Sequence, residues 1–166
     1  ASDALEQGDL AFNNYQNRFL SIAMAKVSTS AHEAINLGIL KTDVGITLNK
    51  ARQIADAKTS VLEIASKGYT QPKQRTDITV YGKQLLGVFQ AGANSYLEAG
   101  YISEYDHFIS MKIGYVMAGG DLSAPTKVSE QYLLDLEREA FLSLCGQRKT
   151  CERIEHMLKK GKPLRN

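Results

Sequence analysis

Apolar side chains recur at spacings of three and four residues along most of the chain, and this spacing restricts the fold more than any other feature. An α-helix gathers such residues on one face, whereas a half-buried strand needs alternation at every second position. Between Leu5 and Ile22 the polar residues fall on the opposite side, as in an amphipathic helix. Six further helices are predicted, at about residues 30–38, from Thr47 or Asn49 to 68, 80–100, 103–119, from Thr126 or Ser129 to 146, and 150–160. The pattern predicts an all-α fold, mainly helical with about seven helices and little or no sheet.

Helix ends carry recognisable capping residues. Ser30 with Glu33 has the spacing of a capping box, and Ser103 can cap the next helix with Asp106 at its third position. Glycines interrupt the segment 80–100, and each costs about 1 kcal/mol in a helix interior. We therefore expect a close neighbour at these glycines, which are Gly82, Gly87 and Gly92.

Two helices have apolar faces that we expect to point inward. In the segment 49–68 the inward residues are Ala51, Ile54, Ala55, Val61, Leu62 and Ala65. In the segment 129–146 they are Leu133, Leu136, Ala140, Phe141 and Leu144. A linker is predicted at 69–79, where Pro72 lies among polar residues, and it divides the chain into parts at 1–68 and 80–166.

Composition supports a folded protein with a core. The chain has 166 residues, of which 43% are hydrophobic, and a net charge of +2. Residues 147–166 hold seven Lys or Arg against two Glu, which raises the question of nucleic-acid binding. The chain has no Trp, and this tail has no aromatic residue on which a base could stack. A solvated helix face explains the charge better, and we expect no nucleic-acid partner.

Cysteine usage and hydropathy favour a cytoplasmic protein. Cys145 and Cys151 lie six residues apart and are expected to be free thiols in a reducing compartment. No apolar run approaches the roughly 18 residues of a membrane span. The chain begins at Ala1 without a Met, which suits a segment cut from a longer protein.

No catalytic or metal-binding constellation is recognisable in the sequence. His32-Glu33 lacks the second His of the H-E-x-x-H zinc helix, and Glu33 is equally well explained as a cap. His107 and His156 stand alone on predicted helices, without ligands at metal spacing. Gly119-Gly120-Asp121 could cradle an anion, but a helix stop explains it better. We predict no catalytic residue and no metal site, and any reaction would be completed by residues outside the chain.

Two stretches resemble a known enzyme family. Residues 25–40, AKVSTSAHEAINLGIL, resemble the Ala-x-Glu-Ala helix and Leu-Gly turn of crotonases, the enoyl-CoA hydratase/isomerase family. More specific are residues 128–144, VSEQYLLDLEREAFLSL, and the ending GKPLRN at 161–166. They resemble the C-terminus of bacterial 3-hydroxyacyl-CoA dehydrogenases of fatty-acid β-oxidation that carry a fused enoyl-CoA hydratase-like domain.

The resemblance implies that this chain is one part of a longer parent enzyme and that the two parts have different roles. Residues 1–68 would be the C-terminal helical part of the crotonase-like domain, and 80–166 a helical extension. The parent would use NAD and a coenzyme A thioester substrate, with its catalytic residues upstream of Ala1. This segment would then be a scaffold that packs against the upstream dehydrogenase and hydratase domains, covers acyl-CoA or forms homo-oligomers. The resemblance also suggests that basic residues near its end meet the CoA phosphates, namely Lys159, Lys160, Lys162 and Arg165.

An alternative remains open on the sequence alone. The exposed apolar faces of a stand-alone helical module would bind a partner helix or a second copy. An uninterrupted reading frame before Ala1 that encodes a strand and a G-x-G-x-x-G turn would favour the enzyme, and a start codon next to Ala1 would favour the module.

Overall fold

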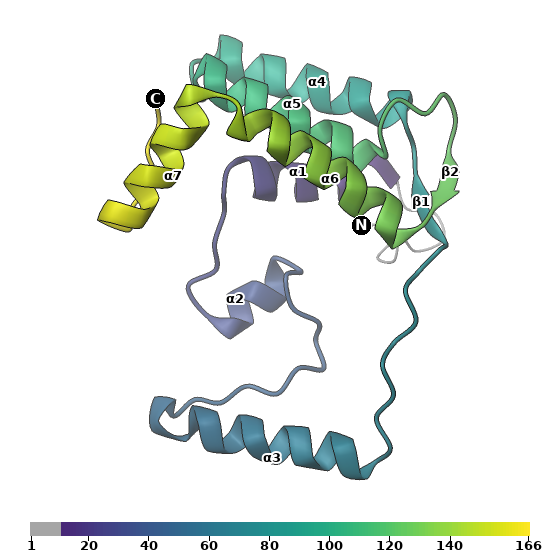
Figure 1. The fold of residues 1–166 in the computed structure, drawn as a ribbon, viewed down its shortest axis with the longest axis vertical. Coiled ribbons are helices and arrows are strands. Elements are labelled where there is room, and N and C mark those ends of the chain that lie inside the picture. The colour runs from purple at the N-terminus through teal and green to yellow at the C-terminus, as the bar shows by residue number, and fades with distance from the viewer. Residues whose placement is uncertain (1–10) are drawn as a thin grey trace. The chain divides into compact units, whose positions relative to one another are not determined.

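The computed structural model describes residues 11–166 and is mainly helical (Figure 1). Seven α-helices, one 3-10 helix and one two-stranded sheet make up the described part of the chain, which confirms the predicted all-α class. In chain order they are α1 Ala11–Ala23, α2 Ala31–Asn36, η2 Lys50–Arg52, α3 Gln53–Ser66, β1 Ile78–Val80, α4 Lys83–Glu98, α5 Glu104–Ala118, β2 Thr126–Val128, α6 Glu130–Cys145 and α7 Arg148–Lys160. None of the helices described is both long and apolar enough to pass through a bilayer.

The chain forms two compact units that do not follow the predicted boundaries. One unit, called unit 1 here, joins the residues up to Lys26 with Gln74–Asn166, and unit 2 is Val27–Lys73. The segment 1–68 is therefore divided, because α1 packs with α4 and α5 rather than with its neighbours in sequence. The predicted linker 69–79 holds the boundary between Lys73 and Gln74 and also most of β1. The assignment of 1–68 to a crotonase-like domain remains a prediction.

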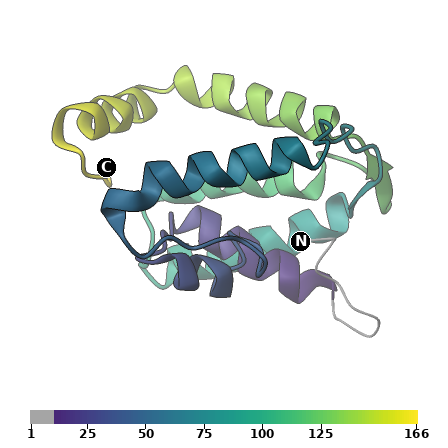
Figure 2. The same cartoon turned by 90° about the horizontal axis from the view of Figure 1, so that it is seen from below.

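The core of unit 1 lies between α1, α4 and α5 (Figure 2). Phe19 of α1 stacks on Phe89 of α4 with ring centroids 4.4 Å apart, and Leu85 of α4 is fully buried. Tyr15 donates its phenolic hydrogen to the backbone carbonyl of Thr79 at 2.7 Å. Burying three large apolar side chains contributes several kcal/mol in total, at about 1.5–3 kcal/mol each. These contacts fix α1 to elements that lie some seventy residues further along the chain.

β1 and β2 form a short antiparallel ribbon, and Val80, the last residue of β1, falls in the segment 80–100 that was predicted to be helical. Val80 pairs with Thr126, and Ile78 pairs with Val128. The predicted helical start at Val80 is therefore wrong, and α4 begins at Lys83. Three-residue strands are too short to show an alternation of apolar and polar residues. The spacing of the following helix therefore led to a predicted helix that starts too early, at Val80.

Gly82 explains how the chain passes from the ribbon into α4. Its φ of 54° lies in the region that favours glycine, and an added Cβ would lie 1.9 Å from the carbonyl oxygen of Leu122. The expected close neighbour is thus confirmed at Gly82. The same expectation is wrong at Gly87 and Gly92, where an added Cβ would meet nothing within 4 Å.

The local capping rules were reliable. Ser103 and Asp106 form the predicted capping box at the start of α5, and Gly119 ends that helix with a φ of 82°. Ser129 caps α6, which settles the predicted choice between Thr126 and Ser129. Helix termini depend on neighbouring residues alone, which is why a single sequence is informative there.

Unit 2 has helices but almost no core. Ala34 is the one buried residue of Val27–Lys73, and α3 buries none. The prediction that the apolar residues of α3 point inward is wrong, since Ile54 is 81% exposed, Val61 64% and Leu62 60%. In α6, likewise, Phe141 is 55% exposed although the other four predicted inward residues are partly buried. An amphipathic pattern shows that a helix is fit to meet a partner, but it does not place that partner within the same chain.

Candidate interaction groove and C-terminal network

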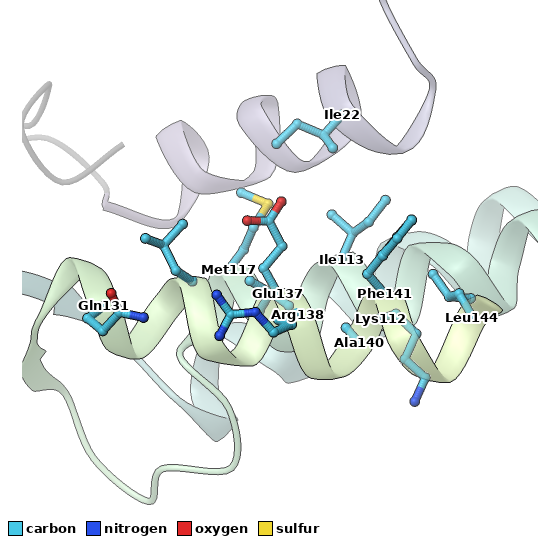
Figure 3. A pocket seen from close by; sticks show the side chains of 12 residues that line it. Ile22, Lys112, Ile113, Met117, Gln131, Glu137, Arg138, Ala140, Phe141 and Leu144 are labelled. Carbon is cyan, nitrogen blue, oxygen red and sulfur yellow. The ribbon is translucent and has the colours of Figure 1, made fainter. Parts of the chain in front are cut away.

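An apolar groove of about 600 Å3 runs along unit 1 between α1, α5 and α6 (Figure 3). In the close-up, Ile22 extends from α1, and Phe141 and Glu137 extend from α6 on the side facing α1. Twelve residues line the groove: Ile22, Lys112, Ile113, Val116, Met117, Gln131, Leu134, Glu137, Arg138, Ala140, Phe141 and Leu144. The lining residues belong to α1, near the start of the chain, and to α5 and α6, which lie far from it in sequence. The groove therefore forms only when unit 1 is folded.

The lining of the groove is mainly apolar, which suits contact with another apolar surface. Its polar side chains are few, and two are turned to other partners: Arg138 is ion-paired with Asp135 at 3.0 Å, and the Lys112 ammonium lies 5.8 Å from the Phe108 ring centroid. The lining contains no Ser, Cys or His that a neighbouring base could activate. The half-exposed ring of Phe141 is available to a partner.

A network centred on Asp106 anchors the end of the chain to α5. The Asp106 side chain is buried, and its Oδ1 accepts hydrogen bonds from Arg153 at 2.7 Å and from Arg165 at 2.8 Å. Its Oδ2 accepts the backbone N–H of Ser103 at 3.2 Å, so one carboxylate serves as both helix cap and ion-pair partner. Charge-assisted bonds of this length are the strong class of hydrogen bond.

Contacts around Arg153 extend the network to Asn166. The Arg153 guanidinium lies 5.0 Å from the Tyr105 ring centroid and donates to the side chain of Asn166 at 2.7 Å. Asn166 in turn donates to Glu152 at 2.8 Å. The Tyr105 hydroxyl is hydrogen-bonded to that of Thr150 at 2.7 Å. α7 and the last six residues are therefore held to α5 through side chains rather than through a large apolar contact.

The surroundings of Asp106 change its acidity. Burial by itself would raise the pKa of this carboxyl, but hydrogen bonds from Arg153, Arg165 and Ser103 outweigh it and lower the pKa to about 2. Asp106 is therefore ionised at neutral pH, as its two arginine partners require. The network thus holds α7 and the end of the chain to α5 through an ionised carboxylate.

The four candidate CoA-phosphate residues are exposed, but they differ in what they already bind. Arg165 is paired with Asp106, and Lys159 forms an ion pair with Glu155. Within residues 11–166, the side chains of Lys160 and Lys162 form no hydrogen bond or ion pair. A CoA phosphate would have to compete with a carboxylate at Lys159 and at Arg165. The suggested contact therefore remains a prediction, with less support at these two residues.

The other candidates for chemistry lie apart. Glu33 accepts the backbone N–H and the hydroxyl of Thr29, both at 2.6 Å, so it serves as a helix cap, though on Thr29 rather than on Ser30. His107 is hydrogen-bonded to Asn94 at 2.7 Å. Across residues 11–166, no group of three His, Cys, Asp or Glu side chains could hold a metal ion. Cys145 and Cys151 are free thiols.

Sequence reasoning missed the partners of Asp106 and the groove. Asp106 was recognised only as a cap, because Arg153 lies 47 residues away and no local pattern connects the two. The groove needs Ile22 beside Phe141, which the apolar pattern of each helix alone cannot predict. The only indication in the sequence was Phe141, which lies at the edge of the apolar face of α6. A side chain at that edge can face either the core or the surface.

The groove and the Asp106 network are the two features of unit 1 that bring together residues far apart in the sequence. Over 162 residues the chain is 43% identical to a "Probable 3-hydroxyacyl-CoA dehydrogenase" of Bacillus subtilis (strain 168), which confirms the resemblance to these dehydrogenases. The match covers 98% of this chain, and the chain spans about a fifth (20%) of the relative's length. No family model matches the chain, and no solved structure does.

Proposed function

We propose that this chain is a structural segment of a 3-hydroxyacyl-CoA dehydrogenase, packing against the domains of the same polypeptide that carry out the reaction. The observation that carries the proposal is the 43% identity along 98% of the chain to a much longer probable dehydrogenase. The apolar groove and the exposed apolar face of α3 support it, because among residues 11–166 neither surface is covered by its own unit. Four fifths of the relative's length lie outside the match and supply a candidate cover.

The parent enzyme, on this proposal, oxidises a 3-hydroxyacyl-CoA with NAD in fatty-acid β-oxidation and carries a fused crotonase-like, enoyl-CoA hydratase-related domain. It works in the cytoplasm, and the segment itself contributes no reacting group. NAD supplies the hydride acceptor for the substrate's C3 hydrogen. The segment stabilises the assembly, helps to cover the acyl-CoA and contributes to contacts between subunits.

The proposal is tested in the full-length polypeptide that contains this sequence. Phe141→Glu places a charge in the groove, and Leu142→Glu is the matched control on the same helix, since Leu142 is 63% exposed and does not line the groove. We expect Phe141→Glu to lower the thermal midpoint and NAD reduction with 3-hydroxyacyl-CoA, because a buried unpaired charge costs several kcal/mol. Leu142→Glu should leave both unchanged.

Two outcomes would contradict this function. A wild-type full-length polypeptide that reduces no NAD with any 3-hydroxyacyl-CoA removes the proposed activity. Equal changes in thermal midpoint and NAD reduction for Phe141→Glu and Leu142→Glu would show that the groove is not the packing surface. The proposed activity would not be affected by that result.

A stand-alone interaction module is the second candidate, and the 81% exposure of Ile54 on α3 favours it. An antibody against this segment decides between the two in cell extract. A band several times larger than 18.3 kDa supports the enzyme segment, and a band near 18.3 kDa supports the module.

A further inference from the structure

The two cysteines of the chain lie on either side of one sharp corner. α6 ends at Cys145, and α7 begins three residues later at Arg148, where the ribbon changes direction (Figure 1). The backbone N–H of Gln147 donates to the carbonyl of Leu144 at 2.9 Å, and that of Cys151 donates to the carbonyl of Gln147 at 3.2 Å. The first bond belongs to the last turn of α6 and the second is the first helical bond of α7, so the two helices meet at the two-residue turn Gly146-Gln147.

The Cys151 thiol points at the other cysteine residue. Its sulfur lies 3.3 Å from the backbone carbonyl oxygen of Cys145 and donates a hydrogen bond to it. The sulfur of Cys151 is therefore in contact with the backbone of Cys145. A disulfide requires the Cα atoms of the two residues to come within about 4.4–6.8 Å of each other.

We propose that Cys145 and Cys151 are a redox-active pair, converted by a peroxide into an intramolecular disulfide that locks the α6–α7 corner. The inference depends on the corner alone and not on the dehydrogenase function. Cys151 is exposed and Cys145 is half-buried, which assigns the first step to Cys151 and the second to Cys145. Exposed thiols meet the oxidant first, and a nearby thiol then resolves the product.

The two steps balance with hydrogen peroxide as the oxidant. The Cys151 thiolate attacks one peroxide oxygen, the O–O bond breaks, and the leaving hydroxide takes a proton to become water. The resulting Cys151 sulfenic acid is attacked at sulfur by the Cys145 thiolate, the S–O bond breaks, and a second hydroxide leaves as water. Two thiols are oxidised, one peroxide is reduced to two waters, and a small thiol such as dithiothreitol reverses the reaction.

The consequence for the molecule follows from what α7 carries. Thr150, next to Cys151, is hydrogen-bonded to Tyr105, and Arg153 is paired with Asp106. These contacts attach α7 to α5 and do not involve the corner itself. A covalent link across the corner keeps α7 against α5 when individual side-chain contacts break.

The disulfide is detected by peptide mapping of the full chain after brief treatment with hydrogen peroxide. Trypsin cuts after Arg138, Arg148, Lys149 and Arg153, so Cys145 and Cys151 fall in separate peptides, residues 139–148 and 150–153. We expect these two peptides to be joined, the intact mass to fall by two hydrogen atoms, and the protein to stay monomeric on non-reducing electrophoresis. Amide exchange at residues 146–153 should slow in the oxidised form and recover with dithiothreitol.

Matched variants make the test decisive. Cys145→Ser should stop Cys151 at the sulfenic acid, which a dimedone probe captures, whereas Cys151→Ser should leave Cys145 largely reduced. Joined peptides found only in a disulfide-linked dimer would overturn the proposal. So would oxidation of Cys151 to the sulfinic acid while Cys145 stays open to alkylation, or unchanged amide exchange in the linked monomer.

Discussion

Unit 1 and unit 2 are built from helices of similar pattern, yet only unit 1 has a core. In unit 1, Phe19, Leu85 and Phe89 are at most 2% exposed. In unit 2, the 14-residue helix α3 buries no residue, and Leu48 before it is 90% exposed. Both have recognisable caps, such as Ser129 on α6 and Ser30 on α2.

The difference shows which part of a helical sequence determines stability. Caps and periodicity decide where helices form, but an isolated helix shorter than about 12–15 residues is marginal in water. Burial against a second element supplies most of the stability, and unit 2 lacks that burial among its own residues. Its apolar residues are consistent with a partner from elsewhere, as the proposed function requires.

The largest expected effect separates the two units directly. Phe89→Ala removes a ring that is 1% exposed and stacked on Phe19, and we expect it to lower the free energy of unfolding by about 3–5 kcal/mol. Val61→Ala in α3 should change it by no more than about 0.5 kcal/mol, because Val61 is 64% exposed. Urea unfolding followed by circular dichroism measures both. Similar losses from the two substitutions would show that unit 2 shares the core of unit 1.

The ion pairs of the two units should differ almost as much. Asp106→Asn removes the carboxylate from a largely buried arginine, Arg153, and from a half-exposed one, Arg165, and we expect a loss of about 2–4 kcal/mol. The control is Asp56→Asn in unit 2, whose 3.2 Å pair with Arg52 has side chains 33% and 71% exposed. Exposed pairs of this kind contribute less than about 1 kcal/mol. A loss from Asp56→Asn as large as that from Asp106→Asn would contradict the comparison.

Acid should remove the contribution of Asp106 within a defined range of pH. Its folded pKa is lowered to about 2, whereas an unfolded Asp has a pKa of about 3.9. The ionised form therefore stabilises the fold above about pH 4, and this stabilisation, about 2 kcal/mol, is lost as pH falls from about 4 to 2. The difference in unfolding free energy between wild type and Asp106→Asn should shrink over that interval. A difference that stays constant down to about pH 2 would rule out this assignment.

How far the sequence predicted the fold depends on how far apart the interacting residues lie. The Ser103–Asp106 box and the stop at Gly119 were predicted correctly, because each involves residues within one or two turns. The β1–β2 pairing of Ile78 with Val128 was missed, since fifty residues separate the partners and neither strand is long enough to show a pattern. Loop closure over such distances leaves no local trace in the sequence.

The candidate site was predicted less well than the fold for the same reason. The resemblance to 3-hydroxyacyl-CoA dehydrogenases pointed to a scaffold, but it identified neither the groove nor the Asp106 network. Arg165 was singled out for its charge and instead neutralises Asp106, 59 residues away. Charge counts show which residues can bind an anion, whereas only the folded chain shows which of them already bind one.

The smallest expected effect tests whether the helices of unit 2 contribute to cooperative unfolding at all. Ser129→Ala removes the hydroxyl that accepts the Tyr132 N–H at 3.1 Å and should cost about 1 kcal/mol, because α6 packs on α5 and its fraying weakens that contact. Ser30→Ala removes an equivalent 3.1 Å bond to the Glu33 N–H of the six-residue helix α2. Since α2 buries only Ala34, its loss should lower helix content slightly and leave the urea midpoint unchanged. If Ser30→Ala shifts the midpoint as much as Ser129→Ala does, the two units unfold together.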